Sequence, residues 1–474
     1  PLAGDAVFVR RLYLDLIGTL PTPEQTRAFV ADKDPKKREK LIDRLIRRPE
    51  FVDIWVMKFS ELLQIRSDNN VNRGISYKAT VLYHDWLKKK LRDNEPMDRI
   101  VSELLSARGG TFSNPAANFY QIERDTKKMA ENVAQVFMGT RLQCAQCHNH
   151  PFDRWTMDDY YGFAAFFTQI GRKKAEDPRE QIVYNRGGGE IKHPVGGRVM
   201  APKFLGGPTP DVQGKDRRKV LADWLTSKDN PYFARNLANI VWSHFFGRGI
   251  VEPVDDVRIT NPPANRRLLE TLGRNFADYR YDFRRLVRDI CNSRVYQLTT
   301  RPNKTNAMDA TNFSRAYVRR VRSEVLYDMI SDVTETAGRN KFRGLPAGSR
   351  AIQIADGRTT NSFLRIFGRA ERKSVCSCEV STEPNLSQAL HLINGSTIQG
   401  KIAQGRVVPG LLDKHKDDDE AIINDLYMRT LSRLPGDTER SRIRETIANA
   451  ENRKAVFEDL FWALLNSRQF IFNH

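Results

Sequence analysis

The chain has 474 residues, of which 40% are apolar and 28% charged, and its formal net charge is +19 at pH 7. This length and composition are typical of roughly two or three globular domains and exclude a disordered chain. No run of about 18 apolar residues occurs, so we expect no membrane span. The positive charge suits an anionic glycan as partner, whereas no nucleic-acid-binding signature accompanies the scattered Lys and Arg residues, which makes nucleic acid an unlikely partner.

Amphipathic helices dominate the first 170 residues. Thr22 has the position of an N-cap, with Pro23 at the first helical position and Gln25 two residues further, as in a capping box. Apolar residues then recur at helical spacing over residues 52–65, 83–91, 97–105 and 129–136. The last of these predicted helices leads into a cysteine motif.

Cys144, Cys147 and His148 have the C-x-x-C-H spacing of a covalent c-type haem site. Two thiols at this spacing can form thioethers to one haem, and the adjacent imidazole can bind its iron. We expect the second ring nitrogen of His148 to donate to a carbonyl or carboxylate. The alternative is a zinc or structural thiol site built on the same cysteines.

Residues around the motif have candidate roles at a haem. Arg154 could pair with a haem propionate, or with Asp153 at the surface. His150 is a candidate catalytic residue and could also bind a different metal, although we favour a structural role in the turn or support of an iron ligand. Candidates for the distal iron ligand are Met129, Met138 and His391, followed by Met57 and His244, with core packing as the alternative for each.

Glycine and proline interrupt the helical pattern over residues 171–215. We expect a linker or small β excursion there, with short strands at residues 181–184 and 198–201. Residues 1–170 and 216–474 then form two helical domains. Further helices are predicted at residues 220–225, 233–246, 266–276, 283–291 and 386–392, so the predicted fold class is mainly α.

Cys376, Cys378 and Glu379 form a second unusual cluster. Thiols in a C-x-C pattern can bind a metal, form a disulfide or supply an axial thiolate, and a nearby glutamate can act as base or ligand. These three residues are therefore candidate catalytic residues, in addition to His150. If they met Cys144 and Cys147 in space, a zinc site would replace the haem.

Several segments carry a resemblance to known domains: residues 9–18 and 20–24, residues 143–153, and residues 239–249, 255–258 and 376–394. The first two groups resemble a planctomycete secreted, cytochrome-c-like domain of unknown function. The third resembles the companion domain of unknown function that usually follows it. The resemblance implies an exported protein with a c-type haem motif and assigns no reaction.

Three functional hypotheses follow. The first is an exported haem c protein that transfers electrons or oxidises a small molecule, with a redox partner or that molecule as its counterpart. The second is a zinc-dependent hydrolase or zinc-stabilised module, and the third is a protein that binds an anionic extracellular polymer. Because haem c is assembled outside the cytoplasm, we expect a periplasmic or secreted protein, with any signal segment outside the printed sequence.

Overall fold

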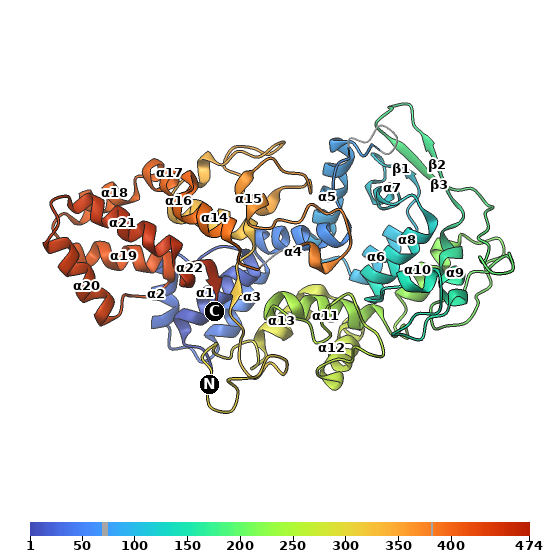
Figure 1. The fold of residues 1–474 in the computed structure, drawn as a ribbon, viewed down its shortest axis with the longest axis horizontal. Helices are drawn as coiled ribbons and strands as arrows, with labels where there is room; N and C mark the ends of the chain where they lie inside the picture. Colours follow the sequence, from blue (N-terminus) through green and yellow to red (C-terminus); the bar gives the residue numbers. More distant parts are fainter. Residues whose placement is uncertain (69–73, 381–382) are drawn as a thin grey trace.

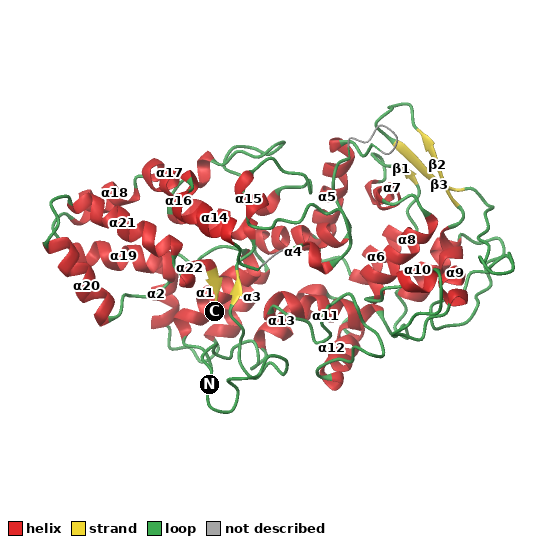
Figure 2. Ribbon diagram, viewed as in Figure 1, coloured by secondary structure: helices red, strands yellow, loops and turns green. Residues whose placement is uncertain are grey.

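Helices make up most of the structure, a computed structural model that describes residues 1–68, 74–380 and 383–474. The molecule is elongated, with helices of the last hundred residues at one end and a small sheet at the other (Figure 1). Strands are few and short (Figure 2), which confirms the predicted mainly α fold class. None of the described helices has both the length and the apolar character needed to cross a bilayer.

Short helices follow one another in the first part of the chain: α1 (Asp5–Ile17), α2 (Pro23–Ala31), α3 (Lys37–Ile46), α4 (Pro49–Leu62), α5 (Tyr77–Arg92), α6 (Met97–Leu105), α7 (Phe119–Ile122), α8 (Thr126–Val133) and α9 (Met157–Ala164). Single turns η1 (Pro115–Asn118), η3 (Gln143–Gln146) and η4 (Ala165–Phe167) lie between them, and the π-helical turn η2 (Ala134–Met138) extends α8. The predicted capping box of Thr22 and Gln25 is present at α2.

The glycine- and proline-rich segment begins with β2 (Ile170–Lys174) and β3 (Gln181–Asn185). These strands form an antiparallel sheet of order β1-β3-β2 with β1 (Gly109–Gly110), which comes from earlier in the chain. The strand predicted at residues 181–184 is thus confirmed. The strand predicted at residues 198–201 is wrong, because only Val199 forms a bridge, with Lys192.

The second part of the chain is again helical: α10 (Arg217–Leu225), α11 (Phe233–Phe246), α12 (Arg266–Asp278), α13 (Phe283–Asn292), α14 (Ser323–Val333), α15 (Ser362–Ile366), α16 (Leu386–Asn394), α17 (Ser396–Gly405), α18 (Val407–His415), α19 (Asp419–Leu431), α20 (Asp437–Ala448), α21 (Arg453–Asn466) and α22 (Arg468–Ile471). Single turns η5 (Ala337–Arg339), η6 (Ala351–Gln353) and η7 (Ser377–Glu379) separate some of them. β4 (Arg319–Arg320) pairs with β5 (Phe472–Asn473).

The two helical parts share one hydrophobic core. Helix α10 packs against α6, α13 against α3, and α11 against η2, so the second part lies along the first (Figure 1). Buried Arg10 on α1 donates to the carbonyls of Thr430 and Gln469, over 2.7 and 2.9 Å. These contacts bring α1, α4 and α11 together with the segments around β4 and η7, where a cavity forms.

Candidate functional site

The C-x-x-C-H motif forms an anchored turn with accessible thiols. Cys144 lies within η3 and Cys147 follows it directly; both thiols are free and both residues are exposed. Ala145 between them is fully buried, and the Tyr161 hydroxyl donates to the carbonyl of Gln146 over 3.1 Å. The turn is therefore held from beneath while its two sulfur atoms remain available for covalent attachment.

His148 has the hydrogen bond that a proximal haem ligand needs. Its Nδ1 lies 2.8 Å from the carbonyl oxygen of Asn149, a distance that requires the hydrogen on Nδ1. In that tautomer Nε2 carries a lone pair, which is the form that binds iron. The side chain is exposed, like the two thiols.

His150 closes the loop that follows the motif. Its backbone N–H donates to the carbonyl of Trp155 over 2.8 Å, and its Nδ1 accepts from the backbone N–H of Phe152 over 3.2 Å. These bonds tie residues 150–155 into a compact loop. Arg154 donates to the Tyr232 hydroxyl over 2.8 Å and stacks over the Trp155 ring.

An exposed apolar side chain of this loop lies near another from a segment later in the chain. Phe152 is 57% exposed, and Ile259, on the segment after α11, is 68% exposed. The segments are joined because the Thr260 hydroxyl donates to the Phe152 carbonyl over 3.0 Å, and Arg258 lies over the Phe152 ring. Apolar surface with adjacent guanidinium groups is suited to one face and the propionates of a haem.

The candidate distal ligands lie in packed surroundings. Met129 and Met138 are 2% and 1% exposed and belong to the core, as does Met57. Nε2 of His391 lies 3.0 Å from the Thr397 hydroxyl, and Nε2 of His244 lies 2.8 Å from the carbonyl of Asp15. Each of these candidates thus has a packing or hydrogen-bonding role of its own in this arrangement.

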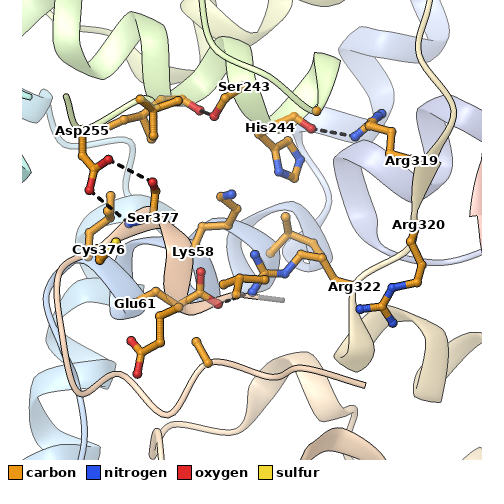
Figure 3. A pocket seen from close by; sticks show the side chains of 18 of the residues that line it. Lys58, Glu61, Ser243, His244, Asp255, Arg319, Arg320, Arg322, Cys376 and Ser377 are labelled. Atoms are coloured by element: carbon orange, nitrogen blue, oxygen red, sulfur yellow. Dashed lines mark hydrogen bonds and ion pairs between the residues drawn. The ribbon is translucent and has the colours of Figure 1, made fainter. Parts of the chain in front are cut away.

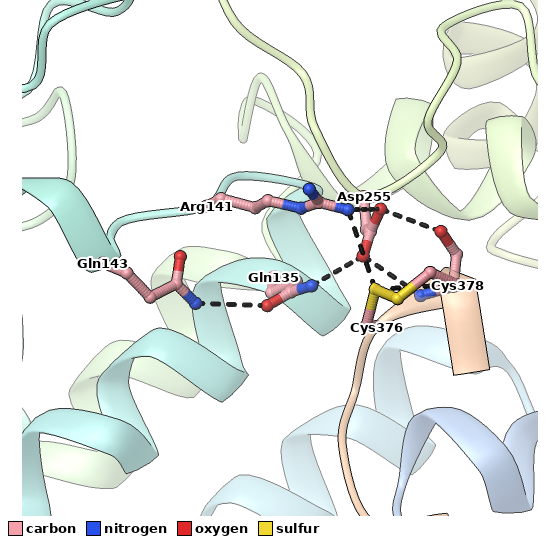
Figure 4. Close-up of a disulfide and its surroundings, with 7 residues drawn as sticks. Gln135, Arg141, Gln143, Asp255, Cys376 and Cys378 are labelled. Atoms are coloured by element: carbon pink, nitrogen blue, oxygen red, sulfur yellow. Dashed lines mark hydrogen bonds and ion pairs between the residues drawn. A yellow bond between two sulfur atoms is a disulfide. The ribbon is translucent and has the colours of Figure 1, made fainter.

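Cys376 and Cys378 form a disulfide around Ser377 (Figure 4). Of the three arrangements open to a C-x-C pattern, the structure shows this one. Nη2 of Arg141 lies 3.9 Å from the Cys376 sulfur. Over residues 1–68, 74–380 and 383–474, no three His, Cys, Asp or Glu side chains are grouped as a metal site would need, so these cysteines do not assemble with Cys144 and Cys147.

Asp255 connects the disulfide loop to the C-x-x-C-H turn (Figure 4). Its carboxylate accepts from the Gln135 amide over 2.6 Å, from Arg141 over 2.8 Å and from the Ser377 hydroxyl over 3.0 Å. Gln135 in turn accepts from Gln143, the residue before Cys144, over 3.4 Å. Burial favours the protonated acid, but these donors and the Arg141 charge outweigh it and lower the pKa of Asp255.

The disulfide loop borders a cavity of about 340 Å³ (Figure 3). Its walls come from α1, α4, α11, the start of α14 and the loop with η7, so both helical parts contribute. Cys376 and Glu379 were candidates from the sequence. Lys58 and Arg322 were missed; a lysine within an otherwise apolar helical face, at residues 52–65, is the one signal that could have indicated Lys58.

Comparison with protein families assigns both parts of the chain. Residues 1–172 match PSCyt2, a protein of unknown function (DUF1549), and residues 217–447 match PSD1, a protein of unknown function (DUF1553). The chain thus combines these two domains, which is the pairing that the sequence resemblance predicts. No curated protein and no solved structure matches the chain.

Proposed function

We propose that this protein is an exported c-type haem protein with a redox role. Cys144 and Cys147 would hold the haem through thioethers, and His148 would bind its iron. The observation that carries the proposal is the Nδ1 contact of His148 with the Asn149 carbonyl, next to two free, exposed thiols on one turn. The haem, when bound, would supply one-electron redox chemistry.

The surrounding residues would orient the haem and leave it accessible. Ala145 and Tyr161 fix the turn from the core side, while Phe152 and Ile259 offer apolar surface and Arg258 a cation. Because the motif is exposed, an edge of the haem would face solvent, which suits electron transfer to a redox partner better than oxidation in a closed pocket.

The test is the visible spectrum of the full chain made in a host that assembles haem c. The C144A/C147A double variant is expected to lose covalent haem, because no thioether can form. H148M is expected to change the iron ligation bands, whereas H150M, two residues away, leaves them unchanged. Covalent haem in C144A/C147A, or equal spectra for H148M and the original chain, would contradict the assignment.

A further inference from the structure

We infer that the central cavity is a binding site for a small organic acid, with the carboxylate held by Lys58. The inference does not depend on haem, since the cavity is separate from the C-x-x-C-H turn. It rests on a cavity between helices of both parts of the chain, on an ammonium group without a hydrogen-bonded partner, and on walls that are otherwise apolar or internally paired.

Lys58 extends from α4 into the cavity (Figure 3). Across the part of the chain that the structure describes, its Nζ forms no hydrogen bond or ion pair. Burial, reinforced by the charge of Arg322, lowers the pKa of Lys58 to about 8. The carboxylates of Glu61 and Glu324 act on Lys58 only through their charge and form no ion pair with it. A half-buried ammonium without a direct partner is poorly stabilised, and an anionic ligand in contact with it would reduce that cost.

The other cations near the cavity are already committed. Arg319 holds the carboxylate of Asp15 with contacts of 2.8 and 2.6 Å, and it also donates to the carbonyl of His244. Arg322 is paired with Glu61. Arg320, also in the wall, donates to the carbonyl of Phe367 over 3.0 Å. Among the described residues of the wall, Lys58 is thus the cation without a direct partner.

The carboxylates of the cavity have partners of their own. Asp255 is occupied by Gln135, Arg141 and Ser377. Glu252 accepts from the backbone N–H of Gly249 over 2.6 Å, and Glu379 from that of Lys373 over 2.8 Å. Since each carboxylate bonds elsewhere, none of them takes the place of an incoming anion at Lys58.

His244 contributes a neutral acceptor. Its Nε2 donates to the Asp15 carbonyl, so Nδ1 carries the lone pair, and burial together with the Lys58 charge lowers the pKa of His244 well below its ordinary value. An uncharged imidazole leaves Lys58 as the electrostatic anchor and can accept a hydrogen bond from a ligand hydroxyl.

Apolar side chains supply the rest of the surface and define the ligand class. They include Ile54, Ile240, Val254, Val321, Val325 and Val375. A cavity of about 340 Å³ is at the lower end of the range for small-molecule sites, roughly 300–1,000 Å³. One anchoring cation and an apolar wall together fit a small monocarboxylate with an apolar body.

Equilibrium dialysis of the full chain with hexanoate and its neutral isostere hexanamide tests the inference. We expect the original chain to bind hexanoate at least about tenfold more tightly, since a desolvated charge pair is worth more than about 1.4 kcal/mol. K58M is expected to remove this preference without weakening hexanamide binding, and K58R to keep most of it.

K89M is the matched control, because Lys89 is a surface lysine of α5 paired with Asp93. It should bind both probes like the original chain. Helical circular dichroism checks that K58M is folded. Failure of the original chain to bind hexanoate, or an unchanged hexanoate preference in folded K58M, would overturn the inference; either result leaves the haem assignment intact, because that is judged by spectrum.

Discussion

Several ionisable side chains of this molecule are buried, where an uncompensated charge is unfavourable. Asp328 on α14 is 1% exposed and accepts from the backbone N–H groups of Ala351 and Ile352, over 2.7 and 3.3 Å. Burial nevertheless raises its pKa to about 7, although the charge of Arg350 opposes the shift. Asp328 thus behaves oppositely to Asp255: Arg350 lies 3.5 Å from the Asp328 carboxylate, whereas Arg141 lies 2.8 Å from that of Asp255, where the donors outweigh burial.

The raised pKa of Asp328 predicts a pH-dependent stability. A carboxyl whose folded pKa lies above its unfolded value stabilises the fold fully below about pH 4, and this contribution is lost as the pH rises to about 7. The free energy of unfolding should therefore fall relative to that of D328N, by up to about 1.4 kcal/mol per pH unit in this window. Urea unfolding of both proteins at pH 5 and pH 8 measures this difference in the free energy of unfolding. Parallel pH profiles of the two proteins would contradict the prediction.

At the scale of elements, the existence of helices is more predictable than their ends, since the periodic residues 52–65 and 83–91 become α4 (Pro49–Leu62) and α5 (Tyr77–Arg92). The apolar periodicity of residues 97–105 and 233–246 predicts α6 and α11 to the residue, and Gly247 ends α11 in a left-handed conformation with φ of 75°. The C-x-x-C-H turn was also found from spacing alone. The cavity is not predictable from the sequence, because Lys58, His244 and Arg322 lie far apart along the chain and come together only through packing.

The segment with η7 depends on one carboxylate for its position. Asp255 joins it to η2 and Arg141, so D255A would leave the Gln135 amide and the Arg141 guanidinium without an acceptor. We expect the free energy of unfolding to fall by about 2–3 kcal/mol, with faster reduction of the Cys376–Cys378 disulfide by dithiothreitol.

Urea denaturation and thiol titration check the D255A prediction. D223A is the control, since Asp223 forms an exposed pair with Lys219 on α10 and its loss should cost less than about 1 kcal/mol. A D255A protein as stable as D223A, with an equally protected disulfide, would show that Asp255 does not hold the segment.

At the scale of the whole molecule, the two domains behave as one packed body. Arg10 is 1% exposed and donates to a carbonyl at the end of α19, where the helix dipole places negative charge, and to a carbonyl within α22. Burial lowers the pKa of Arg10 to about 9. Such contacts between the first and last helices were not predictable, because no local pattern marks a residue 420 positions away as its partner.

The shared core predicts that the full chain unfolds in one cooperative transition. R10M should shift that transition to lower stability by about 3 kcal/mol, because several buried carbonyls lose their charged donor. R27M, at an exposed arginine of α2, should have little effect. Coincident fluorescence and circular dichroism curves check this; two separate transitions would mean that the domains unfold independently.

The mass of the tryptic peptide that contains Cys144, Cys147 and His148 shows whether a haem is covalently attached to this turn. For the chain secreted by a host with haem c assembly, we expect a peptide that is heavier by one haem and absorbs in the Soret region. The same peptide with two thiols that react with iodoacetamide, or with a cystine, would contradict a covalent haem at this turn.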